Sequence, residues 1–188
     1  MSDNPHIGST FDSFLMEDGN YTPRKLDLVY YPNPTLRQEA EKVEVFDDDL
    51  KVLIADMKFT MVEENGAGLA APQVGVSKRL FIFDSKGVIC PLINPVIVES
   101  DDEVYVMEGG EGCLSLPNAF ANVDRARMVR VAYQDENGDP HELTATEQYA
   151  VCIQHEIDHL DGKLFIDYLS PLKRDLAERK VKKALKGS

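Results

Sequence analysis

Apolar side chains between residues 48 and 64 recur with the period of an α-helix. They stand at positions i, i+3, i+4, i+7 and i+11, which places them on one helical face: Leu50, Leu53, Ile54, Met57 and Met61. Three aspartates, Asp47 to Asp49, come directly before them, where acidic side chains can cap the first turn and favour the positive end of the helix dipole. This pattern predicts a helix over residues 48–64.

Short runs of β-branched, aliphatic and aromatic residues dominate the middle of the chain, and Gly, Pro and Asp separate them. Such runs are typical of strands. The strands expected from them cover residues 80–83, 88–93, 96–98, 104–107, 129–133 and 142–144. The last two flank Asp135–Pro140, whose Asn-Gly pair predicts a hairpin.

A second helix is predicted over residues 148–161. Thr144 and Glu147 have the spacing of a capping box, in which each side chain satisfies a backbone N–H group at the helix start. Gly162 follows as a natural C-terminal stop. This helix contains two histidines and two acidic residues in the sequence His155-Glu-Ile-Asp-His159.

A third helix is predicted at the C-terminus. After an extended stretch over 164–169, Ser170 and Pro171 supply an N-cap and a proline at the first helical position, so a helix is expected over 171–186. Repeats and linker-like breaks are absent from the sequence. We therefore expect one α+β domain over 26–188, with antiparallel β-sheets packed around the central helix and a C-terminal helix.

The composition is that of a globular protein, with 43% hydrophobic and 28% charged residues among 188. Residues 1–25 are polar and aperiodic, which predicts a flexible N-terminal extension. The chain has 20 Lys and Arg against 33 Asp and Glu, a net charge of −13, which argues against a protein that binds nucleic acid with most of its surface. Residues 171–188 differ, because they hold seven basic and two acidic residues and leave a local RNA contact open.

The three cysteines, Cys90, Cys113 and Cys152, are scattered and odd in number, unlike the disulfide framework of a small secreted domain. The N-terminal residues lack the basic start and apolar run of a secretory signal, and no apolar stretch approaches the length of a membrane span. We therefore expect a cytoplasmic protein with no membrane contact.

His155 and His159 carry the strongest chemical signal in the chain. On a helix they lie about 40° apart and one turn along the axis, so both imidazoles can bind one metal ion. Glu156 is near enough for its carboxylate to touch a water on that metal without binding the metal itself. Two neutral ligands and an adjacent base are what hydrolysis by an activated water requires.

The third metal ligand has two candidates, and spacing alone leaves both open. Glu178, 19 residues after His159, has the placement used by zinc peptidases with a glutamate ligand. Cys113 offers a soft thiolate, and the adjacent Gly112 allows close backbone approach. We favour Cys113, because Glu178 lies among charges on an amphipathic helix. A zinc peptidase is the second hypothesis and a purely structural metal site is the third.

Three segments together resemble the signature motifs of peptide deformylases, in the same order: Gly66-Ala-Gly-Leu-Ala-Ala-Pro-Gln73, Glu111-Gly-Cys-Leu-Ser115 and Gln154-His-Glu-Ile-Asp-His159. The similarity begins at about Leu26 and extends to the basic C-terminal helix typical of bacterial members. The resemblance implies a metallohydrolase that removes the formyl group from N-formylmethionine at the start of nascent chains and releases formate.

Carried over by position, the resemblance assigns three metal ligands, with water as the fourth: Cys113, His155 and His159. It makes Glu156 the general base. It implies that the side-chain amide of Gln73 and the backbone N–H of Leu114 stabilise the oxyanion. These donors suit a charge that develops only in the transition state.

The resemblance also assigns the substrate contacts. The backbone at Ala67 and Gly68 would pair with the peptide as an added strand, beside Gly112. Val151 and Cys152 lie on the same side of the helix as His155 and would line the methionine pocket. Four positions depart from the common bacterial pattern and leave the peptide preference open: Gly109, Gly110, Phe120 and Gln148.

The cofactor implied by the resemblance is one divalent metal ion, Fe²⁺ in the cell, with Zn²⁺, Ni²⁺ or Co²⁺ able to bind the same ligands. The implied partners are the N-formylmethionyl peptide and the ribosome, which the basic C-terminal helix would contact. We expect a monomer.

Overall fold

A five-stranded antiparallel sheet is the largest element of the computed structural model, which describes residues 21–187. Its strands, in spatial order, are β1 (Gly68–Ala70), β2 (Leu80–Ser85), β3 (Val88–Ser100), β8 (Met128–Gln134) and β9 (Pro140–Thr146). Two short pairs accompany it: β4 (Val104–Tyr105) with β7 (Arg125–Ala126), and β5 (Glu111–Gly112) with β6 (Phe120–Ala121). The expected α+β class is confirmed.

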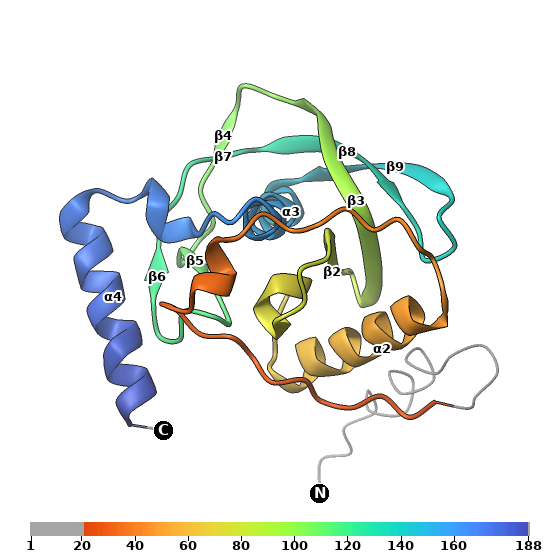
Figure 1. Ribbon diagram of the computed structural model, residues 1–188. Coiled ribbons are helices and arrows are strands. Elements are labelled where there is room, and N and C mark those ends of the chain that lie inside the picture. The colour runs from red at the N-terminus through yellow and green to blue at the C-terminus, as the bar shows by residue number, and fades with distance from the viewer. Residues whose placement is uncertain (1–20, 188) are drawn as a thin grey trace, which may run out of the picture.

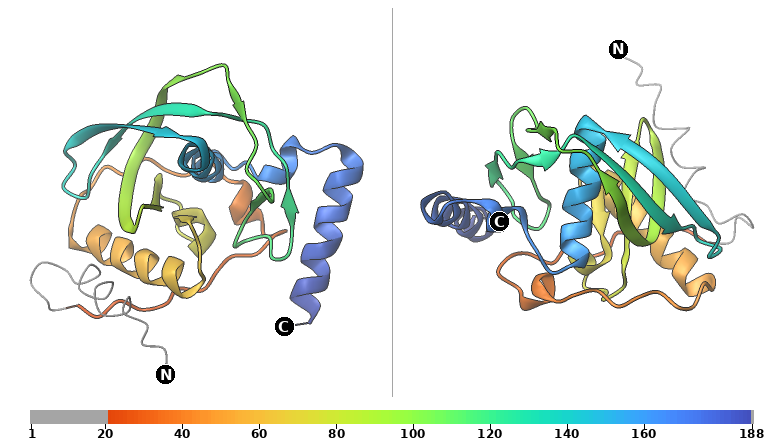
Figure 2. Two further views of the ribbon diagram at one scale, coloured as in Figure 1. Left: turned by 180° about the vertical axis from the view of Figure 1, so that it is seen from behind. Right: turned by 90° about the horizontal axis from the view of Figure 1, so that it is seen from above.

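The described residues also form α-helices and short 3₁₀ helices. The α-helices are α2 (Asp48–Glu63), α3 (Glu147–Leu160) and α4 (Pro171–Lys186). The 3₁₀ helices are η1 (Pro34–Arg37), η2 (Ala71–Val74) and η3 (Phe165–Tyr168). Helix α3 lies in the middle of the molecule, whereas α4 stands at its edge (Figure 1, Figure 2). The three predicted α-helices are therefore confirmed within a residue or so at each end.

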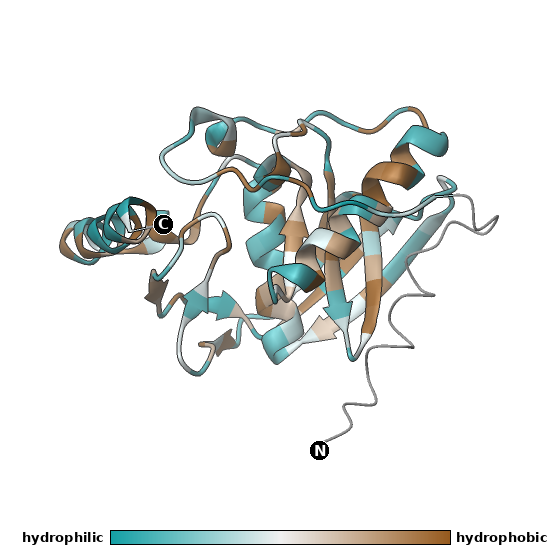
Figure 3. Cartoon of the chain, turned by 90° about the horizontal axis from the view of Figure 1, so that it is seen from below, coloured by the Kyte–Doolittle hydropathy of each residue, from teal (hydrophilic) through white to brown (hydrophobic). Residues whose placement is uncertain are grey.

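Helices α2 and α3 cover opposite faces of the sheet. Side chains of β2 alternate between them: Phe81 and Phe83 pack in the cluster that contains α3, while Leu80 and Ile82 pack in the cluster that contains α2. Both faces of β2 are buried, so its sequence is a continuous run of apolar residues. The apolar segments gather between the helices (Figure 3). Burial of each of these side chains stabilises the folded state by roughly 1.5–3 kcal/mol. This packing fixes the position of α3 on the sheet.

The strands expected over 88–93 and 96–98 form the single strand β3. The register against β8 shifts between Ile93 and Val96, and Asn94 at that point has a φ of 51°. Pro95 is tolerated there because an irregular position needs no ladder N–H. The strand expected over 104–107 is only partly formed, since β4 ends at Tyr105.

The predicted capping box at Thr144 and Glu147 is wrong. Strand β9 continues through Thr144, which pairs with Arg130 of β8, to Thr146. Helix α3 therefore starts after Thr146, whose side chain makes no cap hydrogen bond. Glu147 binds Arg127 instead. Strand pairing with β8 outweighs the local capping preference.

The stretch over 164–169, predicted to be extended, contains η3. The carboxylate of Asp167 accepts a hydrogen bond of 2.9 Å from the backbone N–H of Leu164, which closes the turn. Phe165 and Ile166 are both buried within it. This turn places Phe165 against His155, with the two ring centroids 6.2 Å apart.

Helix α4 packs on the body through Ala177 and Val181, which lie one turn apart and are buried. They belong to a cluster with Leu164 and Phe165. All five lysines of α4 stand at exposed positions: Lys173, Lys180, Lys182, Lys183 and Lys186. The basic charge noted in the sequence therefore faces solvent at one edge of the molecule.

Most of the predicted flexible extension, residues 1–20, lies outside the described residues. Residues 21–25 lie against α2. The buried carboxylate of Asp56 accepts hydrogen bonds of 2.8 Å from the Tyr21 hydroxyl and from the Arg24 backbone N–H. Lys25 forms an ion pair with Glu64.

Candidate functional site

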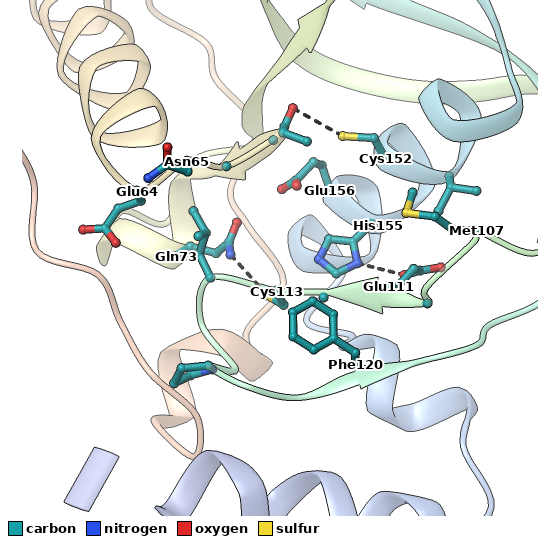
Figure 4. Close-up of a pocket in the computed structure, with 18 of the residues that line it drawn as sticks. Glu64, Asn65, Gln73, Met107, Glu111, Cys113, Phe120, Cys152, His155 and Glu156 are labelled. Atoms are coloured by element: carbon teal, nitrogen blue, oxygen red, sulfur yellow. Dashed lines mark hydrogen bonds and ion pairs between the residues drawn. The ribbon is translucent and has the colours of Figure 1, made fainter. Parts of the chain in front are cut away.

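A cavity of about 540 Å³ opens between β1, the β5–β6 hairpin and α3 (Figure 4). Every residue that the sequence predicted for the site, except His159, lines this cavity: Ala67, Gly68, Gln73, Gly112, Cys113, Leu114, Val151, Cys152, His155 and Glu156. His159 lies deeper and is 1% exposed. Segments up to 89 residues apart in the sequence thus meet at one point.

The thiol of Cys113 and the imidazoles of His155 and His159 converge at the base of this cavity. Their ligand atoms all lie within 4.8 Å of one another, and Cys113 Sγ is 3.2 Å from His159 Nε2. Tetrahedral bonds of 2.0–2.3 Å place two ligand atoms roughly 3.3–3.8 Å apart. The three donors therefore fit one divalent metal ion.

Glu111 orients one of these imidazoles. Its Oε2 lies 2.9 Å from His155 Nδ1, which leaves Nε2 for a metal. Burial opposes protonation of His155, but the neighbouring Cys113 and Glu111 outweigh it and raise the pKa of this imidazole well above its ordinary value. Burial lowers the pKa of His159 well below its ordinary value.

Glu111 is itself held in a buried network that the sequence analysis missed. Arg125 donates to both Glu111 oxygens, over 2.7 and 3.0 Å, and to Asp158 Oδ2 over 2.6 Å. The Tyr168 hydroxyl donates to the other Asp158 oxygen over 2.9 Å, and its ring lies 4.7 Å from the Arg125 guanidinium carbon. Because the guanidinium is bound on both sides, the network holds Glu111 rigidly behind His155.

We expect Glu111→Gln to weaken metal binding by about 10- to 100-fold, the usual cost of losing a hydrogen-bond partner behind a ligand. Equilibrium dialysis with Zn²⁺ measures this. Glu103→Gln is the matched control, because Glu103 is an exposed acid bound to Arg127 and should leave metal affinity unchanged. Equal affinity in the two variants would show that Glu111 does not position the ligand.

Glu156 points into the cavity from α3 and is 3% exposed (Figure 4). A side chain at Gly68 would place its Cβ 2.5 Å from Glu156 Oε1, so glycine leaves the room that the carboxylate occupies. Within residues 21–187, Oε2 of Glu156 has no hydrogen-bond partner. Burial raises the pKa of Glu156 to about 7, and the charge of His155 opposes that rise. A proton acceptor with a free oxygen thus lies beside the three donor atoms.

Gln73 reaches the same place from η2. Its Oε1 accepts a hydrogen bond of 2.8 Å from the backbone N–H of Ala70, which fixes the orientation of the amide. Its Nε2 is 3.2 Å from Ser115 Oγ and 3.4 Å from Cys113 Sγ. The amide N–H₂ group therefore points to the donor cluster. Leu114 follows Cys113 in the chain and lines the cavity.

Comparison with known proteins fits this geometry. The family model of polypeptide deformylases matches residues 25–175. The peptide deformylase of Pseudoalteromonas translucida is 48% identical over 164 residues, which cover 86% of this chain and 96% of that protein. This chain belongs to the peptide deformylase family.

Solved structures of the family have the same fold. The crystal structure of a peptide deformylase from Legionella pneumophila has a TM-score of 0.82 and 45% identity, and the match covers 86% of this chain and 96% of that one. The Ehrlichia chaffeensis peptide deformylase in complex with actinonin has a TM-score of 0.82 and 39% identity, over 86% and 98% of the two chains.

Membership of the peptide deformylase family establishes the reaction. The chain is a metal-dependent hydrolase of the family that removes the N-formyl group from nascent peptides. Among residues 21–187, no helix is both long and apolar enough to cross a membrane.

The alternative third ligand, Glu178, is excluded by position. In this peptide deformylase its Oε1 accepts hydrogen bonds from the Tyr31 hydroxyl, over 2.8 Å, and from Arg174, over 3.1 Å. It lies on α4, and the group of donors that can share a metal contains Cys113 in its place. The reason is that α4 packs on the far side of η3, away from the open face of α3 (Figure 1).

We expect Glu178→Ala to retain its full metal content and to change formate release less than about twofold, since the substitution removes only a partly exposed ion pair with Arg174 and one hydrogen bond from Tyr31. Metal analysis and a formate assay on the purified variant check this. Loss of the metal would restore the zinc peptidase hypothesis.

The four departures from the common pattern fall in different places. Phe120 lines the cavity mouth and is 62% exposed, and its ring covers Gly112 so closely that a Cβ there would lie 2.5 Å from the ring. Gly110 lines the cavity and has a φ of 83°. Gly109 is exposed in the preceding turn, outside the lining. Gln148 lies outside this lining and lines an adjoining groove.

Proposed function

We propose that Cys113, His155 and His159 hold one divalent metal ion, Fe²⁺ in the cell, at which this peptide deformylase acts. The observation that carries the proposal is the convergence of these three donors beside the unpartnered oxygen of Glu156. Thiolate and imidazole ligands suit iron, zinc, nickel and cobalt alike, so any of these ions can occupy the site.

When bound, such an ion supplies a Lewis acid that lowers the pKa of water and polarises the formyl oxygen. Glu156 then accepts the proton of the water that attacks the formyl carbon. The same carboxylic acid delivers that proton to the leaving amine as the C–N bond breaks. Its buried position and raised pKa suit a group that must both accept and donate a proton.

The side-chain amide of Gln73 and the backbone N–H of Leu114 stabilise the oxygen that becomes negative in the transition state. Gln73 is already oriented by Ala70, so little reorganisation is needed when the charge develops. Gln73 and Glu156 lie on different sides of the cavity, which suits attack on a carbonyl held between them (Figure 4).

The peptide binds as an added strand between β1 and β5. Strand β1 is at the edge of the five-stranded sheet, so the backbone of Ala67 and Gly68 has a side free for pairing. Gly112 of β5 lies across the cavity. The first side chain of the peptide then points to Val151 and Cys152 on α3.

Chelation followed by refilling tests this proposal. The protein is stripped with a chelator under nitrogen and refilled with Fe²⁺, and formate release from formyl-Met-Ala-Ser is measured at each stage. Activity should vanish on stripping and return in proportion to bound iron. Full activity of the stripped protein would contradict the proposal.

We also propose that the enzyme acts in the cytoplasm as a monomer, and that α4 contacts ribosomal RNA. Ala177 and Val181 anchor α4, and its exposed lysines present positive charge on an otherwise acidic protein. Co-sedimentation with ribosomes should fall steeply as salt rises.

Replacing four exposed lysines of α4 by glutamine (Lys180, Lys182, Lys183 and Lys186) should lower ribosome co-sedimentation and reduce its salt dependence by about one counterion per lost phosphate contact. Deformylation of free formyl-Met-Ala-Ser should not change. Lys42→Gln, an exposed lysine on another part of the chain, is the control. Unaltered co-sedimentation of the quadruple variant would reject the RNA contact.

A further inference from the structure

A second hollow, of about 360 Å³, adjoins the catalytic cavity. The two share five lining residues, which therefore form the partition between them: Asn65, Gly66, Ala67, Met107 and Cys152. The rest of this second hollow, which we call the side groove, comes from the end of β2, the β2–β3 turn and the first turn of α3: Asp84, Lys86, Gln148 and Tyr149.

The partition is thin. Ala67 is exposed and contributes only a methyl group. The Cys152 thiol lies 3.6 Å from the Ala67 carbonyl oxygen, so the two close one part of the boundary. Met107 is partly exposed, and a methionine side chain adapts readily to a neighbour. No bulky rigid side chain among the five separates the cavity from the side groove.

The two compartments differ in chemistry. The wall of the catalytic cavity that the first substrate side chain meets is made by Val151 and Cys152, which suit an apolar chain. Beyond the partition, the side groove offers the amide of Gln148 and the ammonium of Lys86. The groove also holds the Tyr149 hydroxyl and the Asp84 carboxylate, one oxygen of which already accepts a hydrogen bond from the Gly87 backbone N–H. The end of the groove therefore offers hydrogen-bond donors.

Resting on the proposed function, we propose that the pocket for the first side chain is open-ended and that Gln148 determines specificity there. A side chain longer than methionine passes Ala67 and Met107 and places its end in the side groove. The substrate class implied is N-formyl peptides whose first side chain has an apolar stem and a neutral hydrogen-bond acceptor at its tip.

A closed pocket behaves differently. One extra methylene group in a closed apolar pocket changes kcat/KM by roughly 10- to 200-fold. An open-ended pocket does not impose that penalty, because the added atoms occupy space that is already present. A length series of substrates distinguishes the two.

The experiment uses the metal-loaded enzyme and peptides formyl-X-Ala-Ser, with X as methionine, S-propylhomocysteine or Nε-acetyllysine. We expect kcat/KM for the two longer residues to lie within about tenfold of the methionine value. Gln148→Leu should lower kcat/KM for the acetyllysine peptide by roughly 2- to 10-fold, the effect of one neutral hydrogen bond, and leave the methionine peptide unchanged. Glu147→Gln is the control, because the Glu147 side chain pairs with Arg127.

A fall of more than about 100-fold for both longer residues, with normal turnover of formyl-Met-Ala-Ser, would overturn this proposal and leave the proposed function intact. An equal effect of Gln148→Leu on all three peptides would also overturn it. Absence of turnover with formyl-Met-Ala-Ser itself would contradict the proposed function, and the open-ended pocket with it.

Discussion

Glu156→Gln is expected to lower formate release from formyl-Met-Ala-Ser by about 10²- to 10⁴-fold, the usual contribution of a general base. Glutamine has nearly the same shape, so it can occupy the room that Gly68 leaves and preserve the packing of α3. It cannot accept the proton of the attacking water. Single-turnover formate release measures the effect, and metal analysis of the same sample should give the wild-type content.

The matched control for this variant is Glu147→Gln, the same substitution on the same helix at an exposed position. It should release formate at nearly the wild-type rate. Near-normal turnover of Glu156→Gln would show that the proton goes elsewhere. A loss of metal in that variant would show instead that Glu156 helps to hold the ion.

Cys113→Ala is expected to lose the metal, and with it formate release, by a factor on the order of 10² or more. Loss of a hydrogen-bond partner behind a ligand already weakens metal binding by about 10- to 100-fold, and loss of the ligand itself weakens it more. Only His155 and His159 would remain to bind the ion. Metal content and formate release are measured together on protein purified without oxygen.

Cys90→Ala is the control for the thiol, because Cys90 pairs with Phe83 in the sheet and does not line the cavity. It should retain metal and activity. Full metal content in Cys113→Ala would contradict the proposed ligand set and reopen the search for the third donor.

The parts of the fold that the sequence predicted are those with a strong local pattern. Helix α2 follows from the spacing of Leu50, Ile54 and Met57, and its N-cap is Asp47, as expected. Helix α3 and the approach of His155 to His159 follow from a one-turn spacing on a helix. Cys113 was only the favoured candidate for the third ligand, because no local sequence pattern predicts which distant segment approaches α3.

The parts that could not be predicted depend on contacts between distant residues. Strands β5 and β6 have two residues each, too few to show any alternation, and they exist because Glu111 and Gly112 pair with Ala121 and Phe120. The buried position of Arg125 between Glu111 and Asp158 likewise follows from tertiary packing. The residues around Arg125 give no local sign of that role.

The products formed from formyl-Met-Ala-Ser test the deformylase activity most directly. The iron-loaded protein should release one equivalent of formate for each free methionine amine, with the tripeptide left intact by mass spectrometry. Cleavage between methionine and alanine, with the formyl group retained, would contradict the account and support a peptidase.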